Sequence, residues 1–86
     1  MARPAFRVRP SAWRVWEGLP DVPHPLVDVV EAMDRIPEGE LEVRKLFRPP
    51  AVLHEVTGTV FGRRFTIRGV RGEGGKWAEV WSVRPS

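Results

Sequence analysis

The stretch from Val22 to Val43 limits the possible folds more than any other part of the chain. It contains a proline-rich turn at residues 23–25, an amphipathic segment, a Pro37/Gly39 stop and then the alternating pattern of a strand. The apolar residues of the amphipathic segment recur with the 3.6-residue period of a helix: Leu26, Val29, Val30, Met33 and Ile36. A helix between two strand-like segments predicts a βαβ unit and therefore an α/β fold.

Length and composition indicate a single small domain without cysteine chemistry. The chain has 86 residues and no cysteine, which excludes disulfides, thiolate nucleophiles and zinc–thiolate sites. It has no apolar run of the length expected for a signal peptide or a membrane span. We therefore expect a cytoplasmic protein with no membrane partner.

Four further segments have the alternation of strands, at residues 12–18, 40–47, 64–70 and 76–83. Pro49 and Pro50 suit the start of a second helix over residues 49–61, although the β-branched residues there also suit a hairpin that turns at Gly62-Arg63. With the helix, the predicted order is β-α-β-α-β-β. This order predicts a two-layer sandwich in which a four-stranded mixed sheet carries two helices on one face. Residues 1–11 would form a basic arm or an extra edge strand, and residues 12–86 the domain.

The charge is unevenly distributed along the chain. The net charge is +3, but residues 21–43 contain seven acidic residues and one arginine, while residues 44–86 contain nine basic residues and three acidic ones. Of the 14 basic residues, 12 are arginines, which suit bidentate anion contacts and stacking. This pattern favours either nucleic-acid binding or self-association between unlike surfaces.

Several short motifs resemble the TusA/SirA-like superfamily, and most of all an uncharacterised TusA-related domain often found beside hemerythrin-like domains. The resemblance covers residues 12–84 and rests on P-H-P-L at 23–26, A-M-D-R-I-P-E-G-E at 32–40, Pro49-Pro50 and E-V-W-S-V at 79–83. It implies a two-layer sandwich with a four-stranded mixed sheet.

The resemblance also implies sulfur transfer, which this sequence cannot perform by the family mechanism. TusA proteins carry sulfur on a cysteine in a Cys-Pro-x-Pro turn, and here Val22 precedes Pro23-His24-Pro25. A valine side chain cannot form a persulfide. The relatives also tend to have an acidic, histidine-containing turn before the second helix, where this chain has Lys45 to Pro49.

His24 is a candidate anion-binding residue because it lies at the predicted helix N-terminus. Two parallel crossovers would bring Lys45 and Arg48 to the same sheet edge, where a helix N-terminus and cationic side chains could bind a small anion. The simpler interpretation is a solvated cap without a ligand. His24 and His54 are the only histidines, and His54 is interpreted as a helix-surface residue, so we predict no metal site and no cofactor.

A second candidate surface combines tryptophans with arginines on the open face of the sheet. If Trp13 faces the helices, Trp16 faces outward, and the residues of this surface would be Arg14, Trp16, Arg44, Arg64, Arg68, Trp77 and Trp81. Such a surface could stack single-stranded nucleic acid or bind a protein. Trp77 and Trp81 could equally well lie in the core.

These observations favour a non-enzymatic binding domain that acts through a protein partner or a homodimer. Single-stranded nucleic-acid binding on the arginine and tryptophan face is the first alternative. An accessory role in sulfur or redox metabolism, with a small anion bound near His24, is the second.

Overall fold

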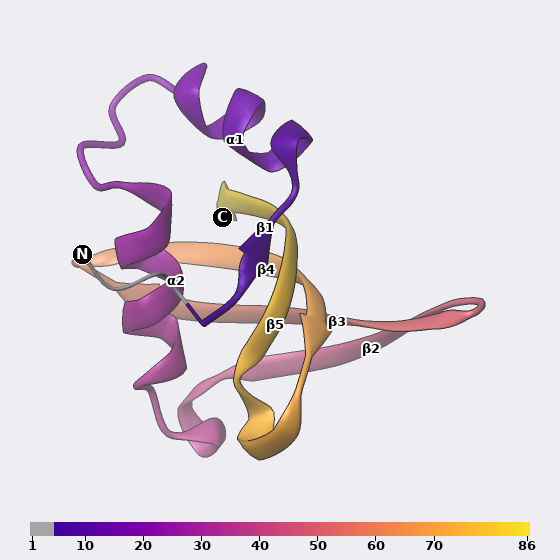
Figure 1. Cartoon of the computed structure of the whole chain (residues 1–86). Coiled ribbons are helices and arrows are strands. Elements are labelled where there is room, and N and C mark those ends of the chain that lie inside the picture. The colour runs from indigo at the N-terminus through magenta and orange to yellow at the C-terminus, as the bar shows by residue number, and fades with distance from the viewer. Residues whose placement is uncertain (1–4) are drawn as a thin grey trace.

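The computed structural model describes residues 5–86, which form two α-helices and a single five-stranded mixed sheet (Figure 1). The helices are α1 (Pro10–Glu17) and α2 (Leu26–Asp34). The strands are β1 (Arg7–Val8), β2 (Glu42–Arg48), β3 (Ala51–Val60), β4 (Arg63–Arg71) and β5 (Trp77–Pro85). The prediction of an α/β chain with a mixed sheet is confirmed, but the sheet has five strands and not four.

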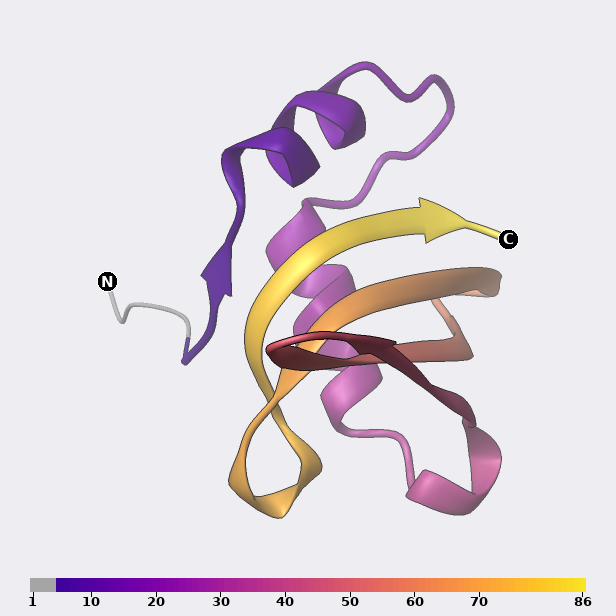
Figure 2. The same cartoon turned by 90° about the vertical axis from the view of Figure 1, so that its right-hand side faces the viewer.

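Strands β2 to β5 form an antiparallel meander, and β1 adds to it in parallel beside β5. The order across the sheet is β1-β5-β4-β3-β2, so β1 and β2 are the two edges. Figure 2 shows that the sheet curves around α2. Helix α2 therefore lies in the concave side of the sheet, and β2 lies at one free edge.

Helix α2 confirms the predicted amphipathic segment. Pro25 precedes its first residue, and Asp28 lies in its first turn, where the helix dipole favours an acid. Its buried side chains are the predicted stripe without Ile36, which follows the helix: Leu26, Val29, Val30 and Met33.

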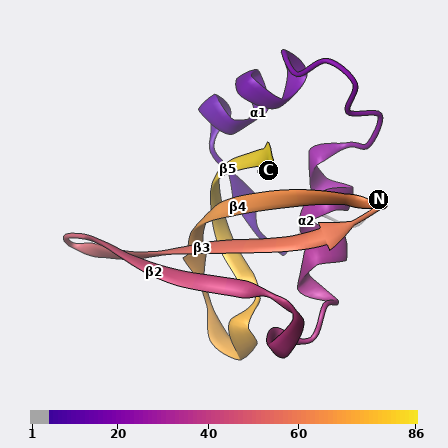
Figure 3. The same cartoon turned by 180° about the vertical axis from the view of Figure 1, so that it is seen from behind.

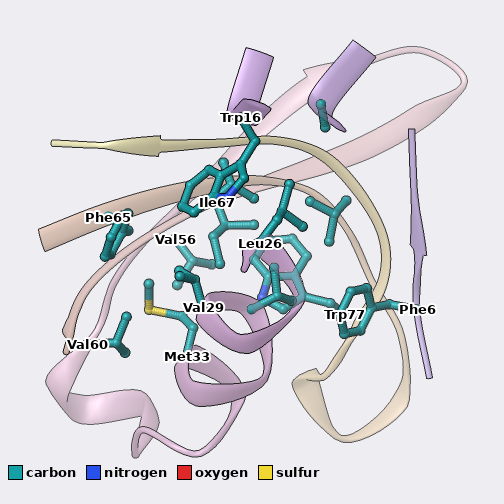
Figure 4. Close-up of a cluster of buried hydrophobic side chains, with 14 residues drawn as sticks. Phe6, Trp16, Leu26, Val29, Met33, Val56, Val60, Phe65, Ile67 and Trp77 are labelled. Carbon is teal, nitrogen blue, oxygen red and sulfur yellow. The ribbon is translucent and has the colours of Figure 1, made fainter. Parts of the chain in front are cut away.

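The core joins both helices to one face of the sheet (Figure 4). Trp16 of α1 lies against Phe65 of β4, with 5.8 Å between the ring centroids. The strand side chains of this core are Val56, Val60, Phe65, Ile67, Trp77, Val80 and Val83. A single contiguous core of this kind is what a chain of this length can build.

The predicted first core strand at residues 12–18 is wrong, because this segment lies in α1. Pro10 stands in the first turn of the helix, and Ala12 and Trp16 are buried four residues apart. The i, i+4 pair and the proline favour a helix over the short Trp13/Val15 alternation. Before α1, Phe6 is buried and Arg7–Val8 form the edge strand β1, while residues 1–4 of the predicted basic arm lie outside the described residues.

The predicted second helix at residues 49–61 is also wrong, and the hairpin alternative is correct except that its turn lies one residue earlier than Gly62-Arg63. Pro49 and Pro50 lie in the turn between β2 and β3, with a cis peptide bond between them. The next turn consists of Phe61 and Gly62, both with positive φ, as in two-residue hairpin loops. The β-branched residues of this segment suit a strand, and their packing on α2 outweighs the helix-starting preference of the prolines.

The strands predicted at residues 40–47, 64–70 and 76–83 are confirmed as β2, β4 and β5, with a break in the alternation of β5. The pairing of β4 with β5 shifts between Arg68 and Gly69 and again between Val70 and Arg71. Trp81 is left without a partner at the first shift, as in a β-bulge. Residues before and after the bulge therefore do not share the simple alternation that the sequence suggested.

In residues 5–86, no helix is both long enough and apolar enough to cross a membrane.

Candidate interaction surface

The hairpin of β2 and β3 projects beyond the rest of the sheet (Figures 1 and 3). Strand β3 pairs with β4 only from His54 onward, whereas its pairing with β2 begins at Ala51. Residues 46–53, which we call the arm, therefore have no neighbour in the sheet other than each other. An isolated two-stranded ribbon is only marginally stable in water. Packing in the core therefore does not account for the apolar side chains that the arm exposes.

The arm exposes apolar side chains on the face that continues the concave side of the sheet. Phe47 is 76% exposed and Val52, its cross-strand partner, is 41% exposed. By strand alternation both share a face with Val43 of β2, which is also exposed. Helix α2 does not reach the arm (Figure 3), so it does not cover these side chains.

Cationic side chains lie on both faces of β2: Lys45 shares the face of the apolar stripe, whereas Arg44 and Arg48 lie on the opposite face. Arg44 is mostly exposed and lies 3.5 Å from the Glu55 carboxylate, which also binds Arg68 at 2.7 Å. Lys45 and Arg48 have no ion-pair partner within residues 5–86. The surface formed by β2 and the arm is therefore apolar and basic.

Strand β2 also presents an unpaired backbone edge. It lies at the end of the sheet order, all its residues except half-buried Leu46 are exposed, and no proline interrupts it. Proteins usually block such edges because a second strand can add to them. Among its seven residues, Glu42 at one end is the single acid.

The residues of the predicted anion site do not come together. His24 precedes α2, its ring stacks on Phe61 at a centroid distance of 4.1 Å, and its carbonyl accepts the Trp16 indole N–H at 3.2 Å. Lys45 pairs with His54, which precedes Phe61 by seven residues (54 to 61) along an extended segment, or roughly 20 Å. Arg48 lies farther out, at the end of β2. His24 serves as a packing residue between the helix start and the β3–β4 turn.

The predicted arginine and tryptophan surface forms only in part, because two of its tryptophans are buried. Trp16 and Trp77 are 7% and 3% exposed, so both belong to the core. Trp81 is half-buried beneath the Arg9 guanidinium, 3.4 Å from its ring centroid, and Arg9 also binds Glu79 at 3.2 Å. Among the predicted arginines, Arg44, Arg64 and Arg68 do share the open face of the sheet, where Arg44 and Arg68 bind Glu55 and Arg64 binds Glu42 at 2.7 Å. Arg14 lies apart from them on α1.

A polar cluster between α2 and the β4–β5 loop was not predicted. The side chain of Arg71 is 11% exposed, and its guanidinium donates two 3.0 Å hydrogen bonds to Glu38 and one of 2.6 Å to the Gly75 carbonyl. His54, expected on a helix surface, lies on β3, and its Nδ1 is buried without a hydrogen-bond partner in residues 5–86. The hydrogen bonds to Glu38 and Gly75 use all three guanidinium nitrogens of Arg71, so this arginine supports the structure and does not serve as an anion receptor.

The cluster shifts the ionisation of its members. Removal from solvent is the main reason why the pKa of His54 lies below its usual value, with Arg71 and Lys45 adding to the effect. The hydrogen bonds from Arg71 lower the pKa of Glu38. The pKa of Asp34 is raised, chiefly because its carboxyl is half-buried, although a hydrogen bond from the backbone N–H of Trp77 opposes this shift.

We predict that Asp34→Asn stabilises the folded chain at neutral pH and not in strong acid. As the pH rises from the ordinary Asp value of 3.8, the unfolded chain loses its proton before the folded chain does. The wild type therefore loses stability through this range, and the variant does not. Urea unfolding of both proteins at a series of pH values measures the difference. A difference that does not change with pH would contradict the raised pKa.

Two hollows adjoin these features. One of about 440 Å³ lies beside the start of β2 and is lined in part by Glu42 and Arg64. Another, of about 200 Å³, lies at the polar cluster. Within residues 5–86, no group of three or more His, Asp or Glu side chains is placed to hold a metal ion.

No protein-family model, curated protein or solved structure matches this chain. The resemblance to TusA-like domains remains a prediction, and the five-stranded sheet differs from the four-stranded sheet that the resemblance implies.

Proposed function

We propose that the chain is a small protein-binding domain whose binding surface consists of β2 and the arm. The observation that carries this proposal is the exposure of Phe47 on a two-stranded ribbon that pairs with no third strand. Large aromatic side chains at exposed positions are a common source of binding energy in protein interfaces. The free edge of β2 adds unpaired backbone hydrogen-bonding groups beside them.

The charge of the surface supports the same proposal. Lys45 lies on the face of the apolar stripe and Arg44 and Arg48 lie on the opposite face of the same strand, and arginine is enriched in protein interfaces. The exposed aromatic residue of this surface is thus Phe47 of the arm, and not one of the tryptophans predicted on the open sheet face.

We predict that Val52→Ser weakens binding about tenfold or more, as for loss of an interface side chain worth about 1.4 kcal/mol or more. The matched control is Val15→Ser, since Val15 is similarly exposed (46%) but lies on α1. Binding is measured in two ways, by light scattering during size-exclusion chromatography and by quantitative capture of proteins from an extract of the source organism. Equal behaviour of wild type, Val52→Ser and Val15→Ser in both assays would contradict the proposal.

A nucleic-acid ligand is a separate outcome of this test. The proteins are mixed with single-stranded oligonucleotides at low salt, where phosphate contacts are strongest. Binding that Val52→Ser reduces, together with unchanged protein capture, would replace the protein partner by a nucleic acid.

A further inference from the structure

We propose that the partner is a second copy of this chain, which adds its β2 strand antiparallel to β2. This inference rests on the proposed function, because it uses the same surface and names its occupant. The result would be one continuous sheet of ten strands across the two copies, with each edge strand β2 covered by the other. A closed dimer of this kind is isologous, so each residue contact occurs twice.

Symmetry limits the possible registers. A two-fold axis perpendicular to the sheet continues each face of one copy into the same face of the other, so paired residues must come from the same face. One register of this kind pairs all seven residues of β2. It places Lys45 on the axis, opposite the partner's Lys45.

This full-length register is also the one that the charges favour. Glu42, the single acid of β2, lies opposite the partner's Arg48, and the reciprocal pair occurs on the other side of the axis. Val43 lies opposite the partner's Phe47, again twice, and both side chains are exposed in the single chain. Cross-strand pairs of opposite charge and of aromatic with β-branched residues are stabilising.

Shifted registers lose this complementarity. A shift of one step in one direction places Arg44 opposite the partner's Arg44, and a shift in the other direction places it opposite the partner's Arg48. Like charges directly opposite each other destabilise a strand pair. The full-length register has one such contact, between the two Lys45 side chains, against four favourable pairs. Lys45 is exposed and its long side chain can extend into solvent.

Because the chain has no cysteine, single introduced cysteines can show which residues face each other across the proposed dimer. Arg44→Cys, Lys45→Cys and Leu46→Cys each introduce a single thiol, and each variant is oxidised at a concentration at which the wild type self-associates. Lys45→Cys is expected to form its disulfide-linked dimer about tenfold faster or more, because only position 45 faces itself within the distance that a disulfide spans. Fastest cross-linking at position 44 or 46 would overturn the register, and equally slow cross-linking at all three would overturn self-pairing.

Charge reversal tests the same register without a covalent bond. Glu42→Arg and Arg48→Glu should each weaken the dimer about tenfold or more, and the double variant should recover most of the loss. Arg64→Ala is the control for Glu42→Arg, since it breaks the intrachain ion pair of Glu42 and leaves the proposed contact intact. Circular dichroism establishes that each variant is folded.

The two proposals fail in different ways. A wild type that stays monomeric at millimolar concentration overturns self-pairing, and a protein captured by wild type but not by Val52→Ser would then still support the binding domain. If the wild type neither self-associates nor captures any other protein, both proposals are overturned.

Discussion

Gly69→Ala is expected to lower the free energy of unfolding by about 3 kcal/mol, the upper end of what over-packing costs. A Cβ at Gly69 would lie 2.0 Å from the Glu79 carbonyl oxygen and 3.1 Å from the Val80 Cα. Both atoms belong to the backbone of β5, next to the bulge, so the clash cannot be relieved by rotating a side chain. The strands themselves would have to separate.

Gly58→Ala is the matched control for this prediction. A Cβ at Gly58 would meet Leu41 Cδ2 at 2.6 Å and Met33 Sδ at 2.7 Å, which are the ends of flexible side chains. We expect a cost of about 1 kcal/mol, because these side chains can move at small expense. Urea unfolding of the two variants and the wild type measures both effects. A smaller loss in Gly69→Ala than in Gly58→Ala would contradict the close approach of β4 and β5 at the bulge.

Phe65→Ala is expected to cost about 3 to 5 kcal/mol of stability, as is typical for removing a phenyl group from a core. Phe65 is fully buried, and its ring lies against that of Trp16. It therefore connects α1 to the sheet. Since small domains are stable by only about 5 to 15 kcal/mol, this one change removes a large part of the total.

Phe47→Ala provides the comparison, with the same chemical change at a position that is 76% exposed. Its expected effect on the unfolding free energy is below about 0.5 kcal/mol. If Phe65→Ala is too unstable to study, Phe65→Leu should show a smaller loss in the same direction. Equal losses at the two positions would show that Phe47 is a core residue and would remove the main support for the arm as a binding surface.

The sequence predicted the elements whose apolar period is long and unambiguous. Helix α2 repeats its apolar stripe over several turns and is bounded by Pro25 and Pro37, so local and tertiary preferences agree. Segment 12–18 is too short to distinguish a strand from a helix by alternation alone. Its better signals were Pro10 and the Ala12/Trp16 spacing.

The candidate site was less predictable because it depends on where the sheet ends. The alternation of β2 alone does not distinguish Phe47 from a buried residue. Phe47 is exposed because β4 stops pairing with β3 at His54, so that the arm extends beyond the part of the sheet that α2 covers (Figure 3). Likewise, Trp81 follows the alternation of β5 in the sequence, and only the bulge changes its position. The run K-L-F-R-P-P, an aromatic residue between basic residues before two prolines, is the one local signal of an exposed turn.

The most direct test of the arm and β2 as the binding surface is an amide chemical-shift map of the ¹⁵N-labelled wild type. The map is recorded as the protein concentration rises from roughly 10 μM to roughly 1 mM, a range that covers weak to moderate self-association. We expect concentration-dependent changes that are largest at residues 42–53 and small on α1. Changes centred on α1 or on the β4–β5 loop, or no changes together with no captured partner, would contradict the proposal.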